Sequence, residues 1–191
     1  MALTRPAPAL LPAIVLAGLA AMPARAHAEG ERALSVGLGW ATFSTPGEPS
    51  MENMEPPAVT PTVGGALSVM YEHAIGSDFS LRGEGAYGMF YGGNTDEQTA
   101  LSHAVLGDVG AVFRFDVLKY VPYAFGGIGA VYTTGGPIAG GTDFVLAIGG
   151  GLDVLVDRAT SWGIEGRLAS FGGDVTIFTL GVRGTHRWGY F

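Results

Sequence analysis

The chain has 191 residues, a length that fits one domain. It contains 17 Asp and Glu against 10 Lys and Arg, which gives a formal charge of −7, and it has no cysteine. The acidic balance argues against nucleic acid as a partner, since phosphate binding needs a basic face, and the lack of cysteine excludes both a disulfide framework and lipoprotein acylation.

The first 26 residues have the features of a secretory signal peptide. Arg5 precedes an apolar run over Ala9–Met22, and the small residues that follow suit cleavage after residue 26 or residue 28. A membrane anchor is the weaker interpretation, because the run contains Pro12 and falls short of the roughly 20 residues that a spanning helix needs. Removing residues 1–26 leaves eight basic and seventeen acidic side chains, a formal charge of −9. We therefore expect a signal peptide over 1–26 and one further domain over 27–191.

Eight segments of this domain alternate in character with a period of two, which puts apolar residues on one face of a strand and polar or small residues on the other. No apolar run after the signal peptide is long enough for a spanning helix, and a membrane chain without such helices must close its strands into a barrel. The predicted strands are Ala33–Phe43, Gly64–Ala74, Phe79–Tyr91, Ser102–Phe115, Pro122–Tyr132, Asp143–Val156, Ser161–Ser170 and Asp174–Phe191. The segment Pro122–Tyr132 is apolar on both faces, so its orientation stays open.

The connections between these segments alternate in length. Long connections at Ser44–Thr62, Gly92–Leu101 and Thr133–Thr142 are separated by short turns at 75–78, 116–121 and 157–160, and only the last connection, 171–173, is shorter than this alternation expects. Eight strands place both chain ends on one side of a barrel. Secretion puts that side in the periplasm, so we expect the long connections to face the cell exterior.

The last segment shows the alternation most clearly. From Phe178 onward, apolar, small and aromatic residues alternate with a second set that includes Arg183 and Arg187, and the chain ends on an aromatic residue. Phe191 falls in phase with the arginines, which predicts either a bulge or the end of pairing at Tyr190. Aromatic residues near strand ends form the expected interfacial girdles: Trp40, Tyr71, Tyr91, Phe115, Tyr123, Tyr132, Trp162 and Trp188.

Through the signal peptide, the alternation, the loop asymmetry and the aromatic terminus, residues 31–191 resemble the OmpA/OmpX-like outer-membrane barrels. The resemblance implies an all-β fold, an eight-stranded antiparallel up-and-down transmembrane β-barrel in the cell outer membrane, with both termini in the periplasm. It implies insertion by the barrel assembly machinery, contact with outer-membrane lipid and lipopolysaccharide, and a monomer. It further implies a structural, adhesion or surface-interaction role.

The polar faces of the predicted strands carry as many arginines as acids. We expect all ten to point into the barrel: Glu72, Glu84, Asp108, Asp153 and Glu165 with Arg82, Arg114, Arg167, Arg183 and Arg187. An eight-stranded barrel is only wide enough for side chains to fill it, and an unpaired buried charge costs several kcal/mol. The sequence therefore predicts a lumen filled by salt bridges, with a narrow pore as the alternative.

An enzyme of this architecture, such as one that modifies lipid A, would need a nucleophile and a base on one face. The candidates are Ser102 with His103, His73 beside Glu72, and His186. Adjacent strand residues point to opposite faces, so Ser102 cannot pair with His103 in extended chain. His73 lies near a periplasmic turn, in the wrong leaflet for lipid A deacylation, and His186 lies among outward aromatics. We therefore predict that the chain is not an enzyme and has no catalytic residue.

Cofactor sites lack support as well. No cysteine is present and no two histidines stand at ligand spacing, so we predict no metal site. The glycine-rich run Gly126–Val131 has no strand–loop–helix context and does not form a phosphate loop. A soluble lipocalin-like binder remains the last alternative, since it also has eight alternating strands, but its apolar faces point inward.

Overall fold

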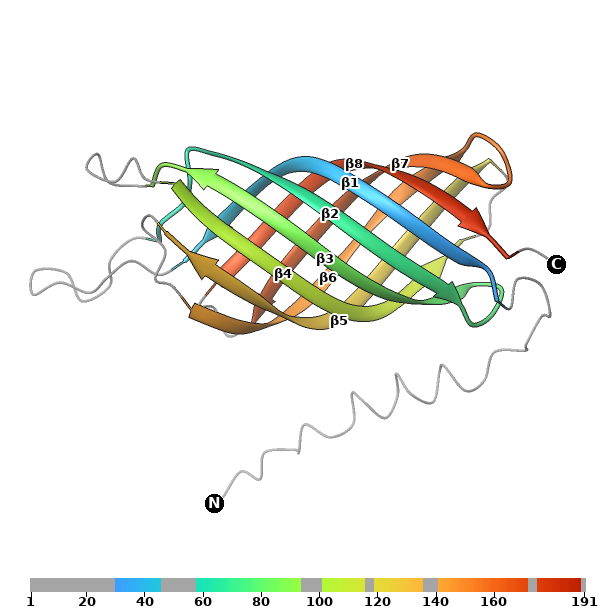
Figure 1. Ribbon diagram of the computed structural model, residues 1–191, viewed down its shortest axis with the longest axis horizontal. Helices are drawn as coiled ribbons and strands as arrows, with labels where there is room; N and C mark the ends of the chain where they lie inside the picture. Colours follow the sequence, from blue (N-terminus) through green and yellow to red (C-terminus); the bar gives the residue numbers. More distant parts are fainter. Residues whose placement is uncertain are drawn as a thin grey trace, which may run out of the picture.

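The structure is a computed structural model that describes residues 30–45, 58–93, 101–115, 119–135, 141–171 and 175–189. Its strands are β1 (Arg32–Ser44), β2 (Val63–Ala74), β3 (Phe79–Tyr91), β4 (Leu101–Arg114), β5 (Tyr120–Thr134), β6 (Gly141–Leu155), β7 (Thr160–Phe171) and β8 (Val175–Trp188). Each pairs antiparallel with the next, and β1 pairs with β8, so the sheet is a closed barrel (Figure 1). The signal peptide and its cleavage site lie outside the described residues.

All eight predicted strands are present, and their ends agree with the expected bounds to within two residues except at the end of β8. β8 ends at Trp188, because Gly189 adopts a φ of +87°, a left-handed conformation that turns the chain away from the strand. The expectations for Tyr190 and Phe191 fall outside the described residues. The alternation of long and short connections also agrees with the sequence analysis.

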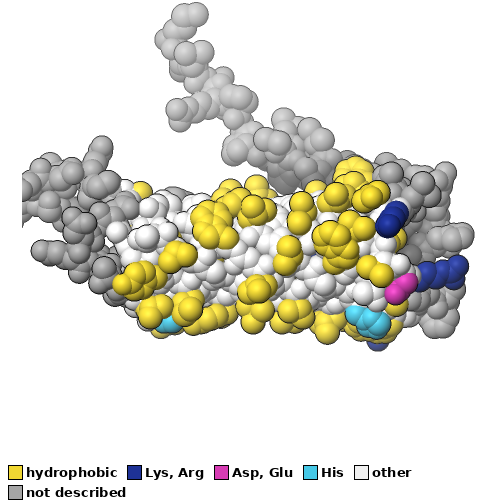
Figure 2. All heavy atoms as spheres, turned by 90° about the horizontal axis from the view of Figure 1, so that it is seen from above, with side chains coloured by type: hydrophobic (Ala, Val, Ile, Leu, Met, Phe, Trp, Pro, Cys, Tyr) yellow, Lys and Arg dark blue, Asp and Glu magenta, His cyan; other side chains and the backbone are white. Residues whose placement is uncertain are grey.

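The outward face of the barrel is apolar. Leu38, Val109 and Val182 are 64%, 63% and 58% exposed, and the wall in Figure 2 is covered by similar side chains, with charged groups visible mainly at one end. This is the reverse of a protein surface in water, and it suits contact with hydrocarbon. It does not fit a lipocalin-like binder, whose apolar faces would line the cavity.

No helix long and apolar enough to cross a membrane occurs among the residues that the structure describes.

Most of the expected girdle aromatics point outward: Trp40, Tyr71, Tyr91, Phe115, Tyr132, Trp162 and Trp188. Tyr123 does not, and its assignment to a girdle is wrong. The structure orients β5 so that Tyr123 and Phe125 face the lumen, where they are 4% and 7% exposed. The sequence left this orientation open because both faces of β5 are apolar.

The barrel interior has two parts. Near the long connections, an apolar core is formed by Ala41, Phe43, Ala86, Phe90, Ala104, Leu106, Val131, Val145, Ala147, Ala169 and Ile177. The rings of Phe43 and Phe90 meet edge to face there, with their centroids 5.0 Å apart. The other part, toward the chain termini, contains the charged side chains.

Candidate functional site: a charged cluster in the lumen

The charged cluster comes from strands on all sides of the barrel. Period-two alternation turns the same face of each strand inward, and the register brings Glu72 opposite Arg82 and Glu84 opposite Asp108. Nearly all of these side chains are buried, although they are the most polar in the chain. Such burial is stable only when each charge finds a partner, so the pairing pattern decides whether the lumen is filled or open.

Arg183 on β8 is the centre of the cluster. Its guanidinium donates to both carboxylate oxygens of Asp153, at 3.0 and 2.8 Å, and to Glu165 at 3.2 Å, and it lies 3.5 Å from Glu72. Its Cζ also lies 4.0 Å from the centroid of the Tyr123 ring. One arginine thus connects β2, β5, β6 and β7 across the barrel.

A second group of charges lies beside this centre. Glu84 forms ion pairs with both Arg82 and Arg167, and Arg82 lies 3.5 Å from Glu165. The guanidinium of Arg82 stacks over the ring of Phe125, 3.6 Å from its centroid. This contact provides a cation–π partner on the apolar side of the arginine.

The remaining pairs extend toward the chain termini. Arg114 pairs with Glu72, and Arg187 lies 3.1 Å from Asp153 and 3.6 Å from Glu31. With these contacts, all five predicted arginines have ion pairs in the lumen. The sequence analysis missed Glu31, because it lies just before the first strand and outside the alternation.

Asp108 is the exception to the predicted pairing. It faces the lumen and is 6% exposed, as expected, but it forms no ion pair with any residue that the structure describes. Its Oδ2 also has no hydrogen-bond partner there. The expectation that all five acids pair is therefore wrong for this residue. Its cross-strand neighbour Glu84 forms the ion pairs with both Arg82 and Arg167.

Two narrow cavities lie beside the charged cluster. One cavity of about 20 Å³ lies beside Arg183 and Met70, and another of about 20 Å³ lies between Arg167 and the apolar core near Phe90. A volume of this size holds about one water molecule. These two gaps beside the ion pairs are narrow, which is compatible with the salt-bridge-filled lumen that the sequence predicts.

The candidate catalytic residues do not come together. Ser102 is buried in the lumen, whereas His103 points outward and its Nδ1 lies 2.7 Å from the hydroxyl of Tyr87. His186 also points outward, and its ring stacks on Trp188 with the centroids 6.1 Å apart. Glu72 forms an ion pair with Arg114 in the lumen, and it lies on the opposite face of β2 from His73. Across the described ranges, no three His, Cys, Asp or Glu residues are grouped as metal ligands would be.

No family model and no curated protein matches the sequence. The fold, in contrast, is similar to solved structures. Ail, the attachment invasion locus protein of Yersinia pestis, is 16% identical, with 84% of this chain and 99% of that chain covered and a TM-score of 0.59. Neisserial surface protein A is 13% identical, with 84% and 100% covered and a TM-score of 0.60. The outer membrane protein AlkL is 11% identical, with 87% and 94% covered and a TM-score of 0.58.

This chain has the fold of a small outer-membrane β-barrel. The likeness confirms the predicted fold class, in agreement with the apolar outer wall and the closed pairing of β1 with β8. At these identities the likeness concerns the fold alone.

Besides Glu31, two members of the site could not be identified from the alternation alone. Tyr123 donates a hydrogen bond to Glu165 at 3.0 Å, and Phe125 stacks under Arg82. Both come from β5, the strand whose facing the sequence left open. Their spacing of two residues was the available signal, because it requires both aromatic rings to share whichever face β5 turns inward.

Proposed function

We propose that this outer-membrane β-barrel is a closed, non-catalytic protein of the cell envelope that acts through its wall and its long connections. The observation that supports the proposal best is the lumen, where Arg183 alone contacts three carboxylates and side chains leave room for about one water at a time. A filled lumen favours a structural or surface-contact role over transport. The three histidines that the structure describes point away from the lumen serine, which favours a role without catalysis.

The proposal includes the position of the protein in the cell. We place it in the outer membrane as a monomer, inserted by the barrel assembly machinery, with its wall against lipid and lipopolysaccharide and both termini in the periplasm. The strand directions put the connections β1–β2, β3–β4, β5–β6 and β7–β8 at one end of the barrel and the chain termini at the other (Figure 1). In this orientation the long connections reach the cell exterior.

The charge of those connections restricts the partners they suit. Between the strands they contain only acidic charged residues: Glu48, Glu52, Glu55, Asp96, Glu97 and Asp174. A structure of Ail is a complex with the heparin analogue sucrose octasulfate. Like charges repel, so we do not expect this chain to bind such a polyanion through its connections; a surface contact would involve a neutral or basic partner.

Conductance across a planar bilayer tests the closed lumen. We expect the reconstituted protein to show no steady current, because paired side chains occupy the path. A double variant, Arg183→Ala with Glu165→Ala, removes two neighbouring members of the cluster and should admit ions, which shows that the assay detects an opening. A steady large conductance of the unchanged protein would instead establish the pore that the sequence analysis left as an alternative.

Lipid A composition tests the absence of catalysis. Cells that express the chain should have the same lipid A acylation as cells without it, measured by mass spectrometry. His103→Ala and His73→Ala variants, expressed to the same level, control for effects of expression itself. An acylation change that depends on either histidine would show that the barrel is a lipid A-modifying enzyme and would overturn this part of the proposal.

A further inference from the structure

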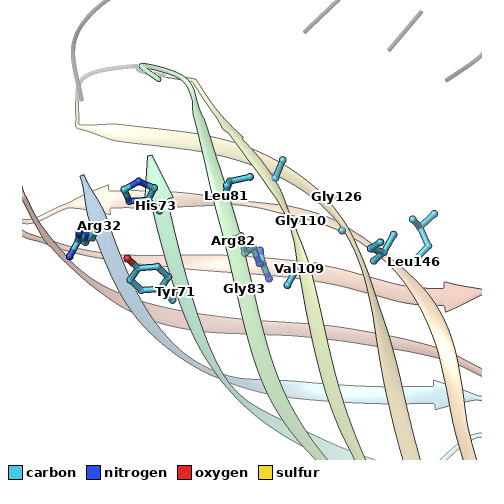
Figure 3. Close-up of a pocket in the computed structure, with 13 residues that line it drawn as sticks. Arg32, Tyr71, His73, Leu81, Arg82, Gly83, Val109, Gly110, Gly126 and Leu146 are labelled. Carbon is cyan, nitrogen blue, oxygen red and sulfur yellow. The ribbon is translucent and has the colours of Figure 1, made fainter. Parts of the chain in front are cut away.

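The outer wall of the barrel is hollowed over β2–β5. The hollow is shallow and open to the outside, with a volume of about 1080 Å³, and it is lined by Tyr71, Leu81, Val109 and Ile128 around a strip of small residues (Figure 3). Gly83 causes much of it, because a Cβ built there would have no atom within 4 Å. The groove is thus apolar and lies on the face that we place in hydrocarbon.

The groove runs from one end of the barrel into the middle of the wall. The register places Arg32, the first residue of β1, opposite His73 near the end of β2, and continues through Leu81 and Ala111 to Gly126, near the middle of β5. Because strands in such a barrel tilt by about 35–45°, a row of paired residues also crosses the wall obliquely. The row therefore extends from the membrane interface at the terminal end toward the bilayer centre.

Polar groups occur at the interfacial end of this groove. Arg32 is exposed and forms no ion pair among the described residues, while Glu31 beside it forms an ion pair with Arg187. The ring of His73 lines the same end, but its Nδ1 atom is enclosed and is not available to a ligand from outside. Figure 3 shows both side chains at the same end, next to Tyr71. A cation at the start of an apolar groove matches an acidic head group followed by an acyl chain.

We propose that this groove is a binding site for one anionic glycerophospholipid. Its phosphate lies on Arg32, and an acyl chain follows the strip of Gly83 and Gly126 across one leaflet, about half of the roughly 30 Å hydrocarbon core. The inference rests on the proposed orientation, which puts Arg32 in the phospholipid-rich periplasmic leaflet.

Native mass spectrometry of the mature full-length chain in detergent can test this site with defined lipids. We expect one phosphatidylglycerol molecule to be retained, with an affinity at least about fivefold above that of diacylglycerol of the same chains, since an arginine near a membrane surface contributes an effect of that size. Glycerol phosphate, the head group alone, should not compete. Lipid A is the phosphorylated lipid of the other leaflet and should bind more weakly than phosphatidylglycerol.

Two pairs of variants locate the binding. Arg32→Gln should weaken binding about fivefold, and Arg158→Gln, an exposed arginine in a turn at the same end, should not. Gly83→Leu fills the groove and should also weaken binding, while Gly184→Leu adds the same side chain at an outward glycine that has equally open surroundings. Both controls also report whether the barrel still folds.

Several results would overturn the site. Equal retention of phosphatidylglycerol and diacylglycerol would mean that no head-group site exists, and unchanged binding in both Arg32→Gln and Gly83→Leu would mean that the lipid binds elsewhere. A preference for lipid A would contradict the glycerophospholipid assignment, and a dimer that excludes lipid would assign the groove to a second copy. None of these results depends on the conductance or acylation tests, so the closed barrel and the lipid site can fail separately.

Discussion

Replacing Arg183 by Met should destabilise the barrel strongly, because this side chain is 1% exposed and contacts three carboxylates. Removing one partner of a buried ion pair costs about 3–5 kcal/mol. Each affected acid keeps another contact: Asp153 has Arg187 at 3.1 Å, and Glu165 has the hydroxyl of Tyr123 at 3.0 Å. The loss in the free energy of unfolding should therefore lie near the lower limit, at about 3 kcal/mol.

A double-mutant cycle separates lost pairing from lost packing. Asp153→Asn removes the acid whose two oxygens accept from Arg183, at 3.0 and 2.8 Å, so the double variant contains neither charge of this pair. We expect the sum of the two single-variant losses in unfolding free energy to exceed the loss of the double variant by about 1–3 kcal/mol. The unfolding free energy can be measured by denaturant titration in detergent micelles, followed by tryptophan fluorescence.

The exposed turn residue Arg158 provides the matched control. Arg158→Met should change the unfolding free energy by less than about 1 kcal/mol, as is usual for an arginine at an exposed site. If Arg183→Met were as mild as this control, or if the cycle with Asp153→Asn were additive, the lumen charges would be solvated and not paired. The closed lumen would then lose its main support.

Three further predictions concern the wall and its orientation. Val182→Arg puts a charge on the lipid face, where the residue is 58% exposed, and should cost about 2–4 kcal/mol and lower the outer-membrane yield. Val182→Leu keeps this face apolar and should leave the yield unchanged; equal yields of the two variants would contradict the facing of β8. Gly39→Ala should cost about 1–3 kcal/mol in denaturant unfolding, since the added Cβ would collide with the backbone of β8. Gly184→Ala has free space around the added Cβ and should be near neutral. Equal effects of the two variants would argue against close packing between β1 and β8. A Glu-specific protease added to intact cells should cut within Ser44–Thr62, and cleavage only after permeabilisation would invert the orientation.

The fold could be predicted from the sequence because a closed barrel in a membrane leaves few choices. A period of two fixes which residues share a face, and hydrocarbon outside the barrel requires the apolar face to be the outer one. These two facts were enough to place Arg183 in the lumen and Val182 outside it, as the structure shows. Of the ten charges predicted to face the lumen, nine form ion pairs in the structure.

What the sequence could not provide was the partner of each charge. Glu84 on β3 and Asp108 on β4 are directly opposite each other, and both could accept from the arginines beside them. The structure gives both contacts to Glu84. Alternation determines only the face of a residue, whereas pairing depends on side-chain reach across the barrel, which requires the register and the curvature of all eight strands.

The lumen also shows why β5 could not be oriented and why its orientation matters. Turned the other way, β5 would present Ile128 and Ala124 to the cluster, and neither can donate to a carboxylate. In the observed orientation Tyr123 donates to Glu165, and the ring of Phe125 lies under the guanidinium of Arg82. Burying an arginine against an aromatic ring offsets part of its desolvation, and a tyrosine hydroxyl satisfies a carboxylate without adding charge. The demands of the charged cluster, rather than the hydrophobicity of β5, therefore explain which face of this strand is turned inward.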